Sequence, residues 1–274
     1  MLDGQHPVAL YNGDVTPNHR PLVFLTGAST GIGEAFARHY AKQGAQLGLV
    51  ARRGDLLEKL AAGLDPKPAI YVADVTDANA LKSAAADFMA RYGLPDIVIA
   101  NAGISVGTLT GQDDDLAVFR KVFETNVLGM VHTFHPFVEP MKAASKGTLV
   151  GIASVAGFRG IPGGGAYSAS KAACIKYCES LRVELKKSGV AVVTICPGYI
   201  KTPMTAVNKF KMPFLIGVDD AVKRFAAAID ARTSFTVIPW TMGIAARLLR
   251  IMPNWLYDTL FQRMPRKPRS TDGG

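Results

Sequence analysis

Short, almost wholly apolar segments alternate with longer amphipathic ones along most of this chain. Strands that are apolar on both faces are typical of a parallel sheet with helices on both faces. The pattern therefore predicts an α/β fold with a doubly wound, seven-stranded parallel sheet. The predicted strands are residues 22–25, 47–50, 69–72, 97–100, 148–152, 190–195 and 235–238. The predicted helices are residues 31–43, 56–62, 79–92, 116–144 and 166–187.

Composition and spacing favour a single domain. The 274 residues are 49% hydrophobic and 19% charged, which excludes a disordered protein and provides enough apolar material for a core. No segment rich in Pro, Gly and Ser interrupts the alternation, so we expect one domain at residues 21–238. Residues 1–20 are predicted to form a flexible N-terminal arm. Residues 239–274 form an apolar-basic C-terminal extension.

Charge and cysteine content narrow the possible partners. Lysine and arginine number 31 against 22 acidic residues, a net charge of +9, but the basic residues form no recognition helix, and no nucleic-acid partner is expected. The three cysteines lack CxxC spacing, which argues against a disulfide framework or a zinc site, and no metal is predicted. No run of about 20 uncharged apolar residues occurs, so no membrane span is expected. The N-terminus lacks a secretory pattern, which predicts a cytoplasmic protein and leaves contact with a membrane surface open.

A glycine-rich turn follows the first predicted strand and opens the first predicted helix. It reads Thr26-Gly27-Ala28-Ser29-Thr30-Gly31-Ile32-Gly33. Such a turn lets the backbone approach a pyrophosphate, which the unpaired N–H groups at the start of the helix can bind. The context of strand, turn and helix predicts a Rossmann-like dinucleotide site formed by Gly27, Ser29, Thr30, Gly31, Ile32 and Gly33.

The end of the second predicted strand indicates which dinucleotide binds. A site for NAD commonly has an acidic residue here to hold the ribose 2′-hydroxyl, but this strand ends in Ala51-Arg52-Arg53. Guanidinium groups suit a 2′-phosphate instead. The sequence therefore predicts NADP(H), with Arg52 favoured over Arg53 as the residue that binds it.

Three further residues supply what carbonyl–alcohol chemistry needs. Tyr167 and Lys171 stand four residues apart at the start of a predicted helix, so they share one face, and Ser154 follows the fifth predicted strand. A tyrosine can donate or accept the proton at the substrate oxygen, and a nearby lysine favours its phenolate form. The serine hydroxyl can polarise the same oxygen, while a nicotinamide carries the hydride.

With these motifs in place, the sequence resembles the short-chain dehydrogenase/reductase family over roughly residues 21–238. The resemblance assigns Asn126, Ser154, Tyr167 and Lys171 to catalysis, with Asn126 supporting a proton-relay water. It also assigns cofactor contacts to Tyr167 and Lys171 and to further residues that follow the strands. These are Asp74, Val75, Asn101, Ala102, Gly103, Pro197, Gly198, Ile200 and Thr202.

The resemblance implies an NADP(H)-dependent oxidoreductase that interconverts a carbonyl and an alcohol, with Tyr167 as the acid and base. It also implies a homodimer or homotetramer built on the two long helices. An alternative is an NADP-binding sensor or interaction protein with little catalysis. A sugar-nucleotide epimerase or dehydratase is disfavoured, since those proteins typically have a Gly-x2-Gly-x2-Gly loop and a larger C-terminal substrate domain.

The substrate is expected to contact loops at residues 105–110, 157–165 and 199–217, which are mainly apolar. They predict an apolar ketone, and their lysines leave a 3-oxoacyl thioester open. The C-terminal extension interleaves apolar residues with arginines; it either packs over the substrate cleft or a partner subunit, which we favour, or lies on a membrane surface. The acidic run at 113–115 is expected to cap the helix that follows.

Overall fold

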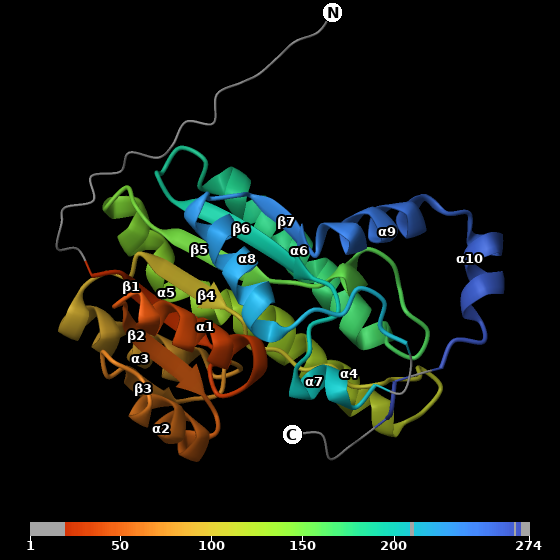
Figure 1. Cartoon of the computed structure of the whole chain (residues 1–274), viewed down its shortest axis with the longest axis horizontal. Coiled ribbons are helices and arrows are strands. Elements are labelled where there is room, and N and C mark those ends of the chain that lie inside the picture. Colours follow the sequence, from red (N-terminus) through yellow and green to blue (C-terminus); the bar gives the residue numbers. More distant parts are fainter. Residues whose placement is uncertain (1–19, 209–210, 266, 270–274) are drawn as a thin grey trace, which may run out of the picture.

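The computed structural model describes residues 20–208, 211–265 and 267–269, so the predicted N-terminal arm lies outside it except for Arg20. The described chain contains a seven-stranded, all-parallel sheet with strand order β3-β2-β1-β4-β5-β6-β7 (Figure 1). This is the predicted Rossmann-like doubly wound fold in a single domain. The strands are β1 (Leu22–Thr26), β2 (Gln46–Ala51), β3 (Ala69–Val72), β4 (Ile97–Ala100), β5 (Thr148–Ile152), β6 (Ala191–Pro197) and β7 (Phe235–Ile238).

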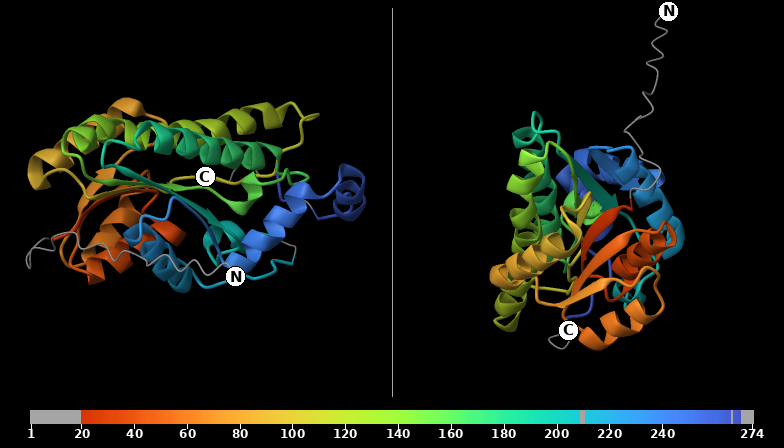
Figure 2. Two further views of the ribbon diagram at one scale, coloured as in Figure 1. Left: turned by 90° about the horizontal axis from the view of Figure 1, so that it is seen from above. Right: turned by 90° about the vertical axis from the view of Figure 1, so that its left-hand side faces the viewer.

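Helices cover both faces of the sheet (Figure 2). Strand β1 shows how the sequence divides its side chains, because Val23 and Leu25 join the core on one face and Phe24 joins the core on the other. The first core is covered by α1 (Gly31–Lys42), α2 (Gly54–Ala62) and α8 (Val218–Asp230). The second is covered by α3 (Ala78–Tyr92), α5 (Gly129–Ala143) and α6 (Gly165–Glu184).

Two features of the helices differ from the sequence prediction. Helix α8 was not among the predicted segments. The single helix predicted over residues 116–144 is instead α4 (Asp114–Phe123), a π-helical segment η1 (Glu124–Leu128) and α5, joined end to end. A π turn widens the backbone locally and shifts the following side chains around the axis. Here it brings the buried Asn126 toward the loop after β4.

The strand order creates a crevice in the middle of the sheet. Strand β1 pairs with β2 on one side and with β4 on the other. The chain continues from β1 to one face of the sheet and from β4 to the opposite face. At such a switch point the carboxyl ends of the strands are left uncovered by a connecting helix, and ligands bind there. The glycine turn after β1 and the segment after β4 meet at this crevice.

Two short elements follow earlier strands: η2 (Val155–Gly157) comes after β5, and α7 (Pro203–Ala206) comes after β6. After β7 the chain adds two helices, α9 (Trp240–Ile251) and α10 (Asn254–Phe261). Figure 1 shows α9 and α10 at the end of the molecule away from β3. The extension therefore folds into helices against the domain edge. No helix among the described residues is both long enough and apolar enough to cross a bilayer.

Candidate active site

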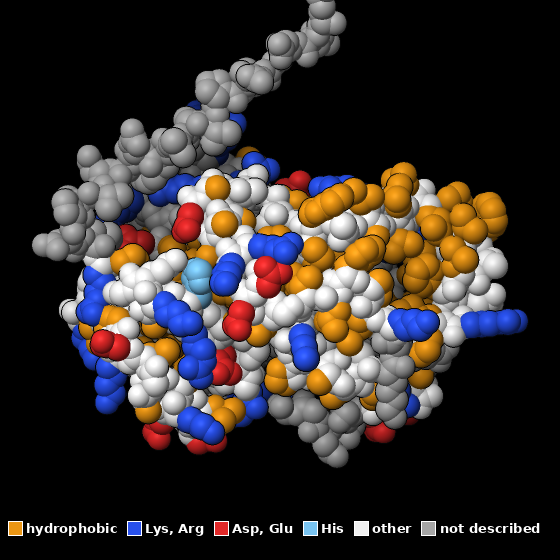
Figure 3. Space-filling view, in the orientation of Figure 1, with side chains coloured by type: hydrophobic (Ala, Val, Ile, Leu, Met, Phe, Trp, Pro, Cys, Tyr) orange, Lys and Arg blue, Asp and Glu red, His pale blue; other side chains and the backbone are white. Residues whose placement is uncertain are grey.

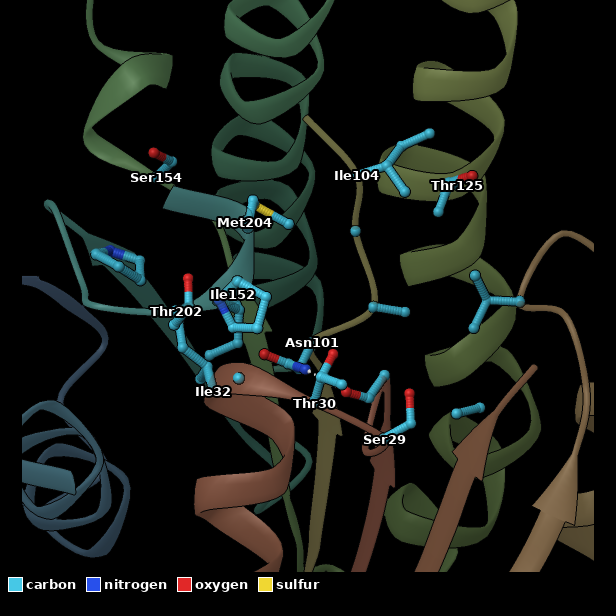
Figure 4. A pocket seen from close by; sticks show the side chains of 18 of the residues that line it. Ser29, Thr30, Ile32, Asn101, Ile104, Thr125, Ile152, Ser154, Thr202 and Met204 are labelled. Carbon is cyan, nitrogen blue, oxygen red and sulfur yellow. Dashed lines mark hydrogen bonds between the residues drawn. The ribbon is translucent and has the colours of Figure 1, made fainter. Parts of the chain in front are cut away.

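A cleft lies at the carboxyl ends of the central strands, and it brings together almost all of the predicted site residues (Figure 4). Those that line it are Gly27, Ser29, Thr30, Gly31, Ile32, Arg52, Arg53, Asp74, Val75, Asn101, Ala102, Gly103, Ser154, Tyr167, Lys171, Pro197, Gly198, Ile200 and Thr202. In Figure 4, Ser29 and Thr30 lie at one end of the cleft and Ser154 at the other. Gly33 and Asn126 do not line it and stand behind its wall.

Two positions of the turn require glycine, because another part of the backbone lies where a Cβ atom would be. Gly27 has φ of 67°, and a Cβ there would lie 2.7 Å from the Cα of Ala102. A Cβ on Gly33 would overlap the carbonyl oxygen of Gly27, so this glycine lets α1 pack against its own turn. The Asn101 side-chain amide donates to the carbonyls of Thr26 and Gly27 at 3.1 Å each and holds the turn in place.

The start of α1 suits an anion. Thr30 precedes the helix in an extended conformation and makes no side-chain capping hydrogen bond to it. The first N–H groups of α1 therefore have no cap from that side chain and face the cleft, where the helix dipole also favours negative charge. This donor set fits the pyrophosphate of a dinucleotide.

Both predicted arginines lie at the mouth of the cleft, and each has a different partner. The Arg52 guanidinium pairs with the Asp74 carboxylate at 3.7 Å, with both side chains partly exposed. Arg53 Nη2 donates to Ser29 Oγ at 3.3 Å and to Thr30 Oγ1 at 3.1 Å. Arg53 and the two hydroxyls thus form a group of anion-binding donors beside the glycine turn, which the preference for Arg52 did not anticipate.

Ser154, Tyr167 and Lys171 meet at the other end of the cleft. Lys171 is 5% exposed, its ammonium donates to the Ile152 carbonyl at 2.8 Å, and it lies 6.0 Å from the centroid of the Tyr167 ring. Ser154 Oγ accepts from the Ala156 N–H at 3.2 Å, so its hydroxyl hydrogen remains available to a ligand. The same cleft is therefore lined by a phenol, a hydroxyl and an ammonium.

Asn126 supports this end of the cleft from behind. Its side-chain oxygen accepts from the Ile104 N–H at 2.8 Å, and its amide donates to the Ile104 carbonyl at 3.0 Å and to Ser170 Oγ at 2.9 Å. The buried side chain therefore ties η1 to the loop after β4 and to α6. These hydrogen bonds position the backbone at Ile104, and the support of a proton-relay water by Asn126 stays a prediction.

Some lining residues were not predicted, because they carry no motif of their own. Ile152 ends β5 and Ala153 follows it, and Thr125 lies in η1, where its position depends on the π turn. The remaining ones are Ala51, Ala73, Ile104, Pro203, Met204 and Thr205. Of these, Met204 had been assigned only to a substrate loop. Position after a strand was the available signal for Ala73, Ile104 and Ala153.

The sequence of this chain is similar to those of known proteins. A family model described as short chain dehydrogenase matches residues 21–212. The chain belongs to the short-chain dehydrogenase family. An uncharacterized oxidoreductase of Myxococcus xanthus is 38% identical over 248 residues, which cover 88% of this chain and 96% of that protein.

Solved structures of other short-chain dehydrogenases share the fold. An alcohol dehydrogenase of the archaeon Thermococcus sibiricus, complexed with 5-hydroxy-NADP, has a TM-score of 0.70 and 27% identity and covers 80% of this chain and 96% of its own. A Burkholderia phymatum short-chain dehydrogenase/reductase in complex with NAD has a TM-score of 0.76 and 23% identity, covering 92% of this chain and 98% of its own. Both structures share the doubly wound fold of this chain.

In this short-chain dehydrogenase the C-terminal extension is attached to the predicted substrate loop at residues 157–165. Arg159 Nη1 donates to the carbonyls of Leu249 at 2.8 Å and Met252 at 2.7 Å, and its guanidinium lies 4.1 Å from the centroid of the Tyr257 ring. The Tyr257 hydroxyl donates to the Gly160 carbonyl at 2.6 Å. The corner between α9 and α10 therefore rests on that loop, and packing over the substrate cleft stays a prediction.

A second attachment joins the end of the described chain to the loop after β4. Lys267 Nζ donates to Ser105 Oγ at 2.7 Å, and burial lowers the pKa of this ammonium to about 8. The buried Asp115 accepts from the Leu109 N–H at 2.6 Å and from Arg269 at 2.8 Å. These contacts correct the capping prediction for residues 113–115, since Asp115 binds these donors and Asp113 makes no side-chain cap.

Proposed function

We propose that this short-chain dehydrogenase is an NADP(H)-dependent enzyme that interconverts an apolar ketone and its alcohol. The observation that carries the proposal is the meeting of Ser154, Tyr167 and Lys171 in the same cleft as the glycine turn. A carbonyl placed beside Tyr167 and Ser154 would have both a proton donor and a second hydrogen-bond donor within reach.

In the proposed mechanism the glycine turn and Arg53 would hold NADPH, which would supply the hydride for reduction of the carbonyl. Tyr167 donates its phenolic proton to the carbonyl oxygen during reduction and accepts a proton in the reverse direction. Lys171 stabilises the negative charge that remains on the tyrosine and holds the nicotinamide ribose. Ser154 donates a hydrogen bond to the reacting oxygen, and Asn126 keeps the adjoining backbone in position.

The arginines support NADP(H) over NAD(H) in this proposal. Arg53 with Ser29 and Thr30 offers several donors to a 2′-phosphate, and Arg52 adds a second guanidinium beside Asp74. An alcohol dehydrogenase relative was solved with an NADP derivative, which supports the same choice. Replacing Arg53 with alanine should weaken NADPH binding roughly 10- to 100-fold and NADH binding much less, because a charge-assisted hydrogen bond would be lost.

An apolar substrate is supported by the side chains around the reacting end of the cleft. Ile104, Ile152 and Met204 line it there. Lys201 and Lys211 are exposed on the loop that follows β6, so a 3-oxoacyl thioester with an anionic carrier remains within the proposed substrate class. Of the residues assigned to this loop, 209 and 210 lie outside the described part of the chain.

We further propose that two or four copies associate through the long helices. Leu116 and Phe119 on α4, Leu128 in η1 and Val183 on α6 are all exposed apolar side chains. Burial of such side chains against a second copy is favourable. The cytoplasm remains the predicted location, where the three free, buried cysteines would stay reduced.

Turnover with Tyr167→Phe distinguishes the enzyme from an NADP-binding sensor. The change removes the hydroxyl that moves the proton, so kcat should fall by about 10²- to 10⁴-fold while NADPH affinity stays nearly constant. Tyr177→Phe, in the same helix, is the matched control and should retain activity. A panel of aliphatic, aromatic, steroid and 3-oxoacyl ketones supplies the substrates. Unchanged turnover by Tyr167→Phe would contradict the assignment, and tight NADPH binding with no turnover by the wild type would favour the sensor.

A further inference from the structure

The outer side of the C-terminal extension carries large apolar side chains that no part of the described chain covers. We call this surface the α9–α10 face; its members are Trp240, Ile244, Leu248, Ile251, Trp255 and Leu260. The first four are spaced to lie on one side of α9, and Trp240, Ile251 and Trp255 are 68%, 78% and 71% exposed. Figure 3 shows hydrophobic side chains gathered over this end of the molecule.

The polarity of α9 is opposite to that of an ordinary surface helix. Its buried residues are the small Gly243 and Ala246, and a Cβ added to Gly243 would lie 3.1 Å from Val237 Cβ of β7. Met242 also packs against the second core, but Trp240, Ile244, Leu248 and Ile251 are exposed, where an isolated globular domain would place polar residues. A contiguous exposed apolar surface of this kind marks a site of interaction.

Basic residues accompany the α9–α10 face. Residues 240–264 contain three arginines and a single acidic residue, Asp258. Two of the arginines, Arg247 and Arg263, are exposed and have no ion-pair partner among the residues that the structure describes. Apolar side chains together with tryptophan and arginine match the boundary of an anionic bilayer, where acyl chains lie beneath negatively charged headgroups.

We propose that the α9–α10 face docks onto the surface of an anionic membrane without crossing it. The twelve residues of α9 are too few to span a bilayer, so the helix lies in the plane of the interface. The contacts of Arg159 and Tyr257 hold the two helices at a set angle, so the surface is formed before binding. This proposal does not depend on which reaction the cleft catalyses.

Charge favours a lipid surface over a second copy of this chain on the same face. A two-fold contact brings each side chain near its own equivalent on the other copy. In such a dimer the α9–α10 face of one copy would meet the same positively charged face of the other, which offers few acidic residues to pair with the arginines. Exposed apolar residues on α4 and α6, such as Leu116 and Val183, offer a separate surface for self-association.

The experiment uses the full chain with phosphatidylcholine vesicles prepared with and without phosphatidylserine. Trp240 and Trp255 are the two tryptophans of the sequence, so their fluorescence reports directly on this face. We expect cosedimentation and a blue shift of emission with the phosphatidylserine vesicles, both weakened by salt. The double variant Ile244→Gln/Leu248→Gln should lower the partition coefficient roughly tenfold or more. Arg247→Gln/Arg263→Gln should lower it severalfold and reduce its dependence on salt.

Val72→Gln is the matched control, because it replaces an apolar residue of similar exposure on β3, at the opposite end of the molecule; it should bind vesicles as the wild type does. Circular dichroism confirms that each variant is folded. No binding and no blue shift for the wild type would overturn the proposal, as would undiminished binding by the folded Ile244→Gln/Leu248→Gln variant. Sedimentation velocity tests whether a second copy of this chain covers the face instead. If the wild type is an oligomer that does not bind vesicles, and if Ile244→Gln/Leu248→Gln dissociates it, the face belongs to contact between copies.

Discussion

Arg159 is expected to hold the C-terminal extension against the substrate loop, and its removal should release the extension locally. Its Nη1 donates to the backbone carbonyls of Leu249, Arg250 and Met252 at the end of α9, and its Nη2 donates to Asn254 Oδ1 at 2.9 Å. The ring of Tyr257 packs against the same guanidinium. One side chain therefore satisfies the last carbonyls of α9 and fixes the direction of α10.

The size of the effect follows from these contacts. A hydrogen bond to a charged group contributes about 1.5–3 kcal/mol, and a cation–π contact contributes about 0.5–2 kcal/mol. Because Nη1 is shared among several carbonyls and the group is partly solvated, we expect about 2–4 kcal/mol for Arg159→Met rather than the sum. That corresponds to roughly a 30- to 1,000-fold increase in local opening. Arg159→Lys should show a smaller increase, since a lysine keeps the charge but loses the planar fork.

Hydrogen exchange resolved to residues 249–262 measures this opening. Amides there should lose protection in Arg159→Met, while amides of β1, β4 and β5 should keep it. Arg247→Met is the control, because Arg247 lies on the same helix and has no ion-pair partner in the described chain. Equal protection of residues 249–262 in Arg159→Met and the wild type would refute the reasoning. Loss of protection throughout the sheet would instead show that Arg159 stabilises the whole domain.

Three further predictions concern the glycine turn and the second attachment. Gly33→Ala should lower the free energy of unfolding by about 1–3 kcal/mol in denaturant titration and weaken NADPH binding, because the added Cβ would overlap the turn. Gly217→Ala is the control: no atom lies near its Cβ, so its free energy of unfolding should stay within about 0.5 kcal/mol of the wild type. Burial lowers the pKa of Lys267 from 10.5 to about 8, so attachment of the segment should strengthen as pH rises from 8 to 10.5. Exchange protection of residues 105–109 measures this, and a rise that persists in Lys267→Met would contradict the cause. Hydrogen bonds from the Leu109 N–H and then from Arg269 lower the pKa of Asp115. The stability that Asp115 gives to this attachment should therefore be present above pH 3.8 and be lost as the pH falls below that value. Asp115→Asn should remove this acid dependence from the exchange protection of residues 105–109.

The sheet and most of the candidate site could be predicted because their signals are local. Buried parallel strands are read directly from short apolar runs, and the glycine turn is required by backbone geometry within eight residues. Tyr167 and Lys171 share a helical face at a spacing of four, so their proximity follows from helix geometry. The segments after β4, β5 and β6 reach one cleft because parallel strands end at one edge of a sheet.

Other features depend on contacts between residues far apart in the sequence. The π turn at Asn126 is maintained by hydrogen bonds to Ile104 and Ser170, and no local pattern announces it. Arg52 and Arg53 look equivalent in sequence, yet packing turns one toward Asp74 and the other toward the glycine turn. Asp115 resembles a helix cap, but a segment more than 150 residues away supplies its arginine.

The sequence by itself determined the fold class and predicted the glycine turn and the candidate reacting groups, because each depends on periodicity or on spacing within a few residues. The tertiary structure alone decided how the C-terminal extension is used. Its alternation of apolar and basic residues is compatible with packing on the cleft and with an exposed face. In the folded chain Arg159 and Tyr257 attach the corner to the loop at residues 157–165, while Gly243 lets α9 approach β7 and Trp240, Ile244 and Leu248 remain exposed.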